Sequence, residues 1–151
     1  MPVEITVVDR PAQPVVFMRR RVRPDEMQQT MAECLPAVFM HCQRSGLTFA
    51  GPPYTRYVDM SRGHFTIETG MPVVEAVGGG EVLAGELPGG AIARAVHAGP
   101  YDTLGAVYSE LEAWAVEAGR PPSGAPWESY LTDPTEVPDP ADWRTEVCLP
   151  L

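Results

Sequence analysis

The sequence predicts one α+β domain, a tandem pseudo-twofold repeat in which an antiparallel sheet carries two main helices on one face. Three observations predict this class. A chain of 151 residues with 44% apolar content can bury one ordinary core. Short β-type runs outnumber the two long stretches of helical periodicity. A segment in the first half of the chain also recurs in the second half, so we expect a single domain over residues 1–151.

The recurrence is densest where GLTFAGPPYTRYV, residues 46–58, is matched by GRPPSGAPWESYL, residues 119–131. Glycine, proline and aromatic positions coincide in the pairs Gly46–Gly119, Gly51–Gly124, Pro53–Pro126, Tyr54–Trp127 and Tyr57–Tyr130. Further along, FTIETGMPV at 65–73 matches WRTEVCLPL at 143–151. The spacing between the two copies, from Gly46 to Gly119, is longer than the roughly 20–50 residues of a solenoid repeat. The pattern therefore favours two half-repeats, at about 1–77 and 81–151, joined by the glycine run 78–80.

The first half-repeat is predicted to contain four strands and one helix. The β-type runs are Val3–Val8, Pro14–Arg20, Tyr54–Asp59 and His64–Met71. The helix extends from about Asp25 to Arg44, because apolar residues recur there at helical spacing and Gly46 follows as a stop. Pro36 lies inside this stretch and removes a backbone hydrogen bond, so we expect a kink or a late helix start.

The second half-repeat shows the same succession of elements. Its β-type runs are Val82–Leu87, Ala91–His97, Trp127–Thr132 and Arg144–Leu149. Its helix extends from about Asp102 to Ala118, and Gly119 ends it. The stretch DPTEVPDPAD, residues 133–142, is rich in proline and aspartate and predicts an exposed, irregular loop.

Composition and charge exclude several classes of function. A formal net charge of −9 repels phosphate backbones, which argues against direct nucleic-acid binding. No apolar run is long enough to cross a membrane, and the first residues lack the pattern of a secretion signal, so a cytoplasmic protein is expected. The three cysteines and three histidines lack metal-site spacing, and no phosphate-binding glycine motif occurs, so we expect no cofactor. Cys34 and Cys42 are two helical turns apart and predict a buried helix face.

Glu128 is the first candidate for chemistry. It is the one acid in the strand WESYL, whereas the matching position in the other half-repeat is the neutral Thr55. A buried carboxylate is unfavourable unless a partner compensates it, and a ligand cation or hydrogen-bond donor is such a partner. The alternative is a solvent-facing glutamate on an edge strand.

Aromatic residues around Glu128 suggest walls of a ligand pocket. Tyr130 shares the strand face of Glu128, and its counterpart Tyr57 is predicted to approach it near the pseudo-twofold axis. Phe65 and Trp143 are a further matched pair. Aromatic rings beside a carboxylate suit planar or cationic apolar compounds. Ordinary core packing is the alternative for each of these four residues.

Two other matched pairs are less specific. Glu68 and Glu146 recur at one strand position and predict either an acidic pocket pair or two solvated positions, with Glu146 the better ligand candidate. Tyr54 and Trp127 occupy the other strand face, and we expect them to pack under the helices.

The stretch LPGGAIARAVHAGPYDTLGAVYSELEAWAVEAG, followed by WESYLTDP and TEVCLPL, resembles the GyrI-like small-molecule-binding family. The same domain serves as effector sensor in multidrug-responsive regulators of the MerR and AraC types. The resemblance implies a ligand pocket between two repeats, and an acidic residue at the position of Glu128 that meets cationic drugs. The 151 residues leave no room for a helix-turn-helix, so a stand-alone binding protein is expected.

Three functions remain open at this stage. The first is a binder of small amphipathic or cationic organic molecules, for sensing or sequestration. The second, which the resemblance also implies, is a hydrolase of cyclopropane-bearing genotoxic compounds. In it Glu128 acts as general base while Tyr130 or Tyr57 donates a proton. The third is a protein-directed module that acts on a toxin or on gyrase through its acidic surface.

Overall fold

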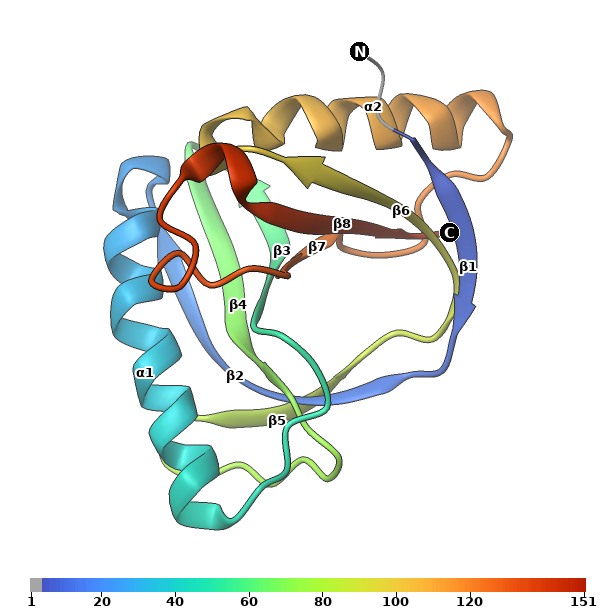
Figure 1. The fold of residues 1–151 in the computed structure, drawn as a ribbon. Helices are drawn as coiled ribbons and strands as arrows, with labels where there is room; N and C mark the ends of the chain where they lie inside the picture. Colours follow the sequence, from blue (N-terminus) through green and yellow to red (C-terminus); the bar gives the residue numbers. More distant parts are fainter. Residues whose placement is uncertain (1–3) are drawn as a thin grey trace. The chain divides into compact units, whose positions relative to one another are not determined.

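Four strands and one long helix make up each of the two units into which the chain folds (Figure 1). The computed structural model describes residues 4–151. The first unit is Ala12–Pro88, and the second unit is Gly89–Leu151 together with the described residues up to Pro11. Every strand pair within the units is antiparallel. The α+β class predicted from the sequence is therefore confirmed.

The first unit has the sheet order β3-β4-β2-β5. Its elements are β2 (Gln13–Val22), the 3₁₀ turn η1 (Pro24–Glu26), α1 (Met27–Ser45), β3 (Tyr54–Ser61), β4 (His64–Pro72) and β5 (Leu83–Leu87). The helix α1 ends at Gly46, whose left-handed φ of 67° a glycine adopts without strain. Pro36 lies within α1, and the helix still begins at Met27, so the late start is not observed.

The second unit has the sheet order β1-β6-β8-β7. Its elements are β1 (Thr6–Arg10), β6 (Gly90–Ala98), η2 (Tyr101–Thr103), α2 (Leu104–Glu117), β7 (Trp127–Tyr130), η3 (Pro140–Asp142) and β8 (Arg144–Pro150). Val3, where the sequence predicts the first strand to begin, lies outside the described residues. The strand at Trp127 ends at Tyr130, two residues earlier than predicted.

One edge strand of each unit comes from the other half of the sequence. β1 pairs with β6 in the second unit, with Val8 opposite Ile92. β5 follows the glycine run 78–80 but pairs with β2 in the first unit, with Val15 opposite Gly85. The unit boundaries near Pro11 and Pro88 thus differ from the predicted half-repeats at about 1–77 and 81–151.

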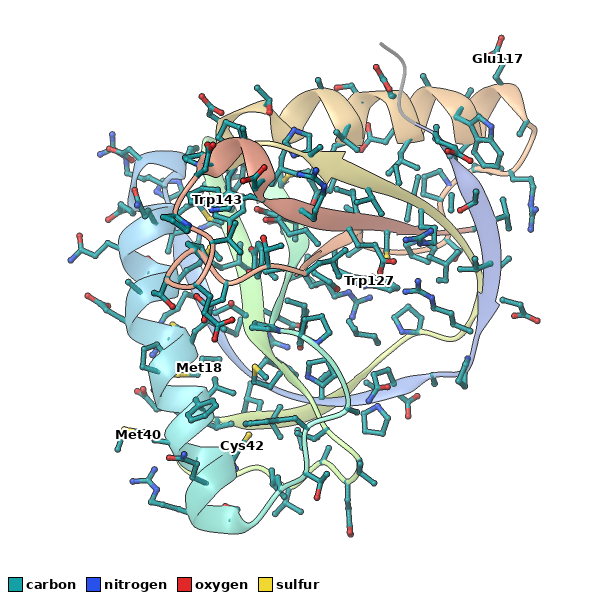
Figure 2. All side chains as sticks on the ribbon, viewed as in Figure 1. Met18, Met40, Cys42, Glu117, Trp127 and Trp143 are labelled. Atoms are coloured by element: carbon teal, nitrogen blue, oxygen red, sulfur yellow. The ribbon has the colours of Figure 1, made fainter. Side chains whose placement is uncertain are left out.

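Each helix buries an apolar face against the sheet of its own unit. The core under α1 gathers Val16, Met18, Cys34, Val38, Cys42, Met71, Val73 and Val82. The core under α2 gathers Ala93, Ala95, Leu104, Val107, Leu111, Ala115, Val147 and Leu149. Met18 and Cys42 lie between α1 and its sheet, whereas Met40 is 54% exposed on the outer side of the helix (Figure 2). The predicted buried face of Cys34 and Cys42 is confirmed.

Strand alternation shows on which sheet face Glu128, Trp127 and Tyr54 lie. In the second unit, Val147 and Leu149 face α2, so Glu128, which pairs with Val147, lies on the helix side. Trp127 pairs with Cys148 and lies on the opposite side. In the first unit Tyr54 pairs with Gly70, on the side away from α1. The prediction that Tyr54 and Trp127 pack under the helices was wrong, because alternation shows which residues share a face but not which face a helix covers.

Candidate ligand-binding site

The carboxylate of Glu128 is the centre of a buried polar cluster in the second unit. Glu128 is only 4% exposed to solvent. Tyr108 donates its hydroxyl to Oε1 at 2.7 Å, and Tyr130 donates its hydroxyl to Oε2 at 2.8 Å. Each carboxylate oxygen therefore accepts a short hydrogen bond from a phenol.

The local sequence explains why these three residues meet. Glu128 and Tyr130 are two apart on β7, so both side chains project to the side that faces α2. Tyr108 lies on α2, one residue after the buried Val107 and three before the buried Leu111. Its ring packs against the core under the helix, and its hydroxyl reaches the strand below.

Aromatic rings continue this cluster on one side. The rings of Tyr101 and Tyr130 lie 5.6 Å apart, and those of Tyr101 and Trp143 lie 4.9 Å apart. The indole of Trp143 donates its Nε1–H to the carbonyl of Val137 at 2.7 Å, which holds the ring in place. Burial, followed by the nearby carboxylates of Glu128 and Asp133, raises the pKa of Tyr101. Its phenol therefore stays neutral at physiological pH.

This arrangement suits an organic cation with aromatic or apolar substituents. The two phenols that donate to Glu128 are neutral, so they orient the carboxylate without supplying a positive charge. Ring faces attract a cation through their quadrupole, and flat rings offer large contact areas. A buried carboxylate in a cluster with four aromatic rings thus offers both charge and apolar contact to the same ligand.

The structure brings three predicted site residues together: Glu128, Tyr130 and Trp143. Tyr57 and Phe65 form an edge-to-face pair in the first unit, with ring centres 5.8 Å apart. Both are half-buried. Thr55, the counterpart of Glu128, is fully buried and shares a 3.1 Å hydrogen bond with Thr69.

Glu146 lies on the opposite side of the sheet from Glu128. It pairs with Ser129 and Val96 across the strands, which places it on the side away from α2. Its carboxylate contacts Arg10 at 2.9 Å and Arg94 at 2.7 Å. Burial raises its pKa, but hydrogen bonds from Arg10, Arg94 and Cys148 outweigh burial and bring the pKa to about 2. These ion pairs give Glu146 a structural role in joining β1, β6 and β8.

Two members of the cluster were not predicted as site residues. Tyr108 follows the helical periodicity of α2, and Tyr101 lies just before that helix, so neither residue stands out in the sequence as a site residue. The signal in the sequence is the hydroxyl that Tyr108 carries beside the apolar residues of its helix face, because a buried hydroxyl needs an acceptor.

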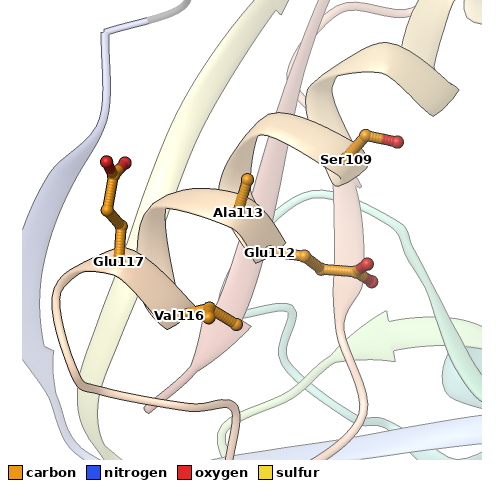
Figure 3. A pocket seen from close by; sticks show the side chains of 5 residues that line it. All are labelled: Ser109, Glu112, Ala113, Val116 and Glu117. Carbon is orange, nitrogen blue, oxygen red and sulfur yellow. The ribbon is translucent and has the colours of Figure 1, made fainter.

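The surface of α2 and the arrangement of the metal-binding residue types differ from this cluster. A shallow depression on α2 is lined by Ser109, Glu112, Ala113, Val116 and Glu117, all from one helix with no opposing wall (Figure 3). Within residues 4–151, histidine, cysteine and acidic side chains nowhere gather in threes in a way that fits a metal ion. Neither helix in that range has the length and apolar character of a membrane span.

Solved structures with the same fold were found by comparison. EcmrR in a cryo-EM structure of its DNA complex is 23% identical with a TM-score of 0.86, over 99% of this chain and 57% of that chain. The present chain thus spans little more than half the length of that protein. The crystal structure of the EcmrR C-terminal domain gives 23% identity and a TM-score of 0.87, over 99% of this chain and 98% of that chain.

More distant structures share the fold as well. A hydrolase from Listeria innocua is 15% identical with a TM-score of 0.62, over 99% of this chain and 92% of that chain. SAV2435 bound to tetraphenylphosphonium is 12% identical with a TM-score of 0.58, over 97% of this chain and 93% of that chain. A search among curated protein sequences gave no match.

A family model described as the GyrI-like small molecule binding domain matches residues 3–151. This match covers almost the whole chain, and it agrees with the fold shared with the EcmrR C-terminal domain. The chain belongs to the GyrI-like small-molecule-binding domain family.

Proposed function

We propose that this protein binds small amphipathic organic cations at the Glu128 cluster, for multidrug-type sensing or sequestration. The proposed site consists of Glu128, Tyr130, Trp143 and the two additional tyrosines, Tyr101 and Tyr108. Tyr57 and Phe65 remain predicted ligand residues of the first unit.

The observation that carries the proposal is the carboxylate of Glu128, 4% exposed and held at both oxygens by phenols. The groups that hold Glu128 at these two oxygens are phenol hydroxyls, which orient the carboxylate, and aromatic rings lie beside it. A ligand cation gains most from such a setting, because electrostatic attraction strengthens as water is excluded.

The comparisons support this ligand class. SAV2435, which shares the fold, was solved with tetraphenylphosphonium, a cation surrounded by four aromatic rings. That compound combines the two features that the Glu128 cluster would recognise, a positive charge and flat apolar surfaces. It is therefore the probe of choice.

The test compares tetraphenylphosphonium binding by the wild-type protein and by Glu128→Gln in calorimetric titrations. We expect the variant to bind at least about tenfold more weakly, because the amide keeps the shape but removes the charge. Glu117→Gln removes the same charge from the exposed end of α2 and should bind like wild type (Figure 2). Equal affinity in wild type and Glu128→Gln would contradict the proposal.

A hydrolase is the second candidate, and the short hydrogen bonds between tyrosine and Glu128 favour it. A carboxylate that holds a phenol at 2.8 Å places a base and a proton donor side by side. Glu128 would take a proton from water as the water attacks a strained ring carbon. Tyr130 would protonate the carbon that leaves. Incubation with a cyclopropane-bearing alkylator tests this: ring-opened product that disappears in Glu128→Gln supports it, and no product above buffer contradicts it.

A further inference from the structure

A second hollow lies in the first unit, on the side of its sheet that faces away from α1. Its volume is about 270 Å³. The residues around it are Val15, Phe17, Arg19, Tyr54, Arg56, Glu68 and the segment 84–87 of β5. All of them belong to the first unit, so none is part of the Glu128 cluster.

Strand pairing shows which side chains enter this hollow. Arg19 and Arg56 both pair directly with Glu68, so the three charged side chains project to the same side. Phe17 pairs with Gly70 and points the same way. Glu86 pairs with Pro14, the residue next to Val15 in β2. Because neighbouring residues of a strand point to opposite faces, the side chain of Glu86 points to the face that α1 covers, away from the hollow. The charges inside the hollow are therefore two arginines and one glutamate.

One arginine is already compensated. Arg19 donates from Nε at 2.9 Å and from Nη2 at 2.6 Å to the same oxygen, Oε2 of Glu68. The guanidinium of Arg19 also lies 5.8 Å from the centre of the Phe17 ring. The charges of Arg19 and Glu68 therefore compensate each other in this ion pair.

The other arginine is not compensated. The Nε–H of Arg56 is buried and has no hydrogen-bond partner among the described residues, and its guanidinium forms no ion pair with them. A buried donor without an acceptor is unfavourable, and such groups are rare in native proteins. A guanidinium presents a planar fork that fits the two oxygens of a carboxylate. Arg56 therefore lacks an acceptor that an anionic ligand would supply.

The remaining walls are apolar or neutral. Val15, Phe17 and Leu87 are buried hydrophobic residues, and Tyr54 is 1% exposed. Burial raises the pKa of Tyr54, so its phenol is a neutral group at every physiological pH. A ligand in this hollow would meet a positive charge at one end and apolar side chains at the other.

We propose that this hollow is a second ligand site, which binds a small organic carboxylate through the guanidinium of Arg56, with Arg19 assisting and Val15, Phe17 and Leu87 holding the apolar part. The site is separate from the cation site at Glu128 and takes ligands of the opposite charge. Benzoate is a suitable probe, because it combines a carboxylate with one aromatic ring in a volume that the hollow can accept.

The test follows the arginine Nε–H signals in nitrogen-edited NMR spectra during a titration with benzoate. All eleven basic residues of the chain are arginines, so the arginine signals report on every cationic side chain. We expect saturable shifts of the Arg56 and Arg19 signals. Arg56→Gln should weaken benzoate binding at least about tenfold. Arg44→Gln, which removes the same charge at the exposed end of α1, should not change it.

Two further measurements separate this site from the proposed function. Glu128→Gln should keep benzoate binding although it loses tetraphenylphosphonium. Arg56→Lys keeps the charge but not the planar fork, and should bind benzoate more weakly than wild type. Absence of saturable shifts at Arg56, or equal loss of benzoate binding in Arg44→Gln and Arg56→Gln, would overturn the second site and leave the cation site untouched.

Discussion

Two buried glutamates of the second unit show how neighbours decide what a residue does. Glu128 and Glu146 lie on adjacent strands, and both are less than 10% exposed. Glu146 is bound by two arginines and closes the contact between β1, β6 and β8. Glu128 is bound by two phenols and lies beside aromatic rings. The first therefore has a structural role in its sheet, and the second is the centre of the proposed ligand site.

Glu146 should make stability depend on acid pH. Its folded-state pKa of about 2 lies below the ordinary value of 4.5, so its contribution is fully present above pH 4.5 and is lost as pH falls toward 2. The contribution is roughly 2 kcal/mol, because exposure of Arg10 screens part of the ion pair. Denaturant unfolding across this window should show a smaller loss of stability in Glu146→Gln than in wild type. Parallel pH profiles would contradict the assigned role.

At the scale of elements, close strand packing limits what the central strands of the first unit tolerate. A Cβ added at Gly70 of β4 would clash with the carbonyl oxygen of Val16 and would lie 2.7 Å from the Cα of Phe17. Both of these atoms belong to the backbone of β2, the strand that pairs with β4. A side chain at this position therefore separates the two strands.

Gly70→Ala should reduce the free energy of unfolding by roughly 3 kcal/mol or more, because the strain falls on backbone atoms that cannot rotate away. Gly105→Ala is the matched control. Gly105 lies in the first turn of α2, where an added Cβ meets no atom within 4 Å. That substitution should stabilise the protein by up to about 1 kcal/mol through helix propensity. Urea denaturation of both variants checks the opposite signs, and a neutral effect of Gly70→Ala would be evidence against the tight pairing of β2 with β4.

At the scale of the whole molecule, the net charge of −9 should attract cationic ligands. Salt screens such attraction, with a Debye length of about 10 Å at 0.1 M. Tetraphenylphosphonium affinity should therefore fall several-fold between low and high salt. Triphenylphosphine oxide, a neutral compound of similar shape, should show little change in the same titrations. Equal salt responses of the two compounds would show that charge does not govern their binding.

Much of this fold was predictable because its signals are local. Helical spacing around Val38 and Leu111 and short β-type runs identified both helices and the strands within a few residues. Strand alternation placed Glu128 and Tyr130 on one face, and the acid within an aromatic strand marked the candidate site. Each of these signals depends on residues fewer than about eight positions apart, so each can be read without knowing how the chain packs.

The sequence by itself determined the class of elements, their order and the conspicuous acid at Glu128. Only the tertiary structure decided that β1 pairs with β6 and β5 with β2, because strand pairing joins segments far apart in the chain. It also decided that Glu128, and not Trp127, faces a helix, and that Tyr108 reaches it. Helix docking and the meeting of Glu146 with Arg10 depend on distant contacts, for which local periodicity carries no information.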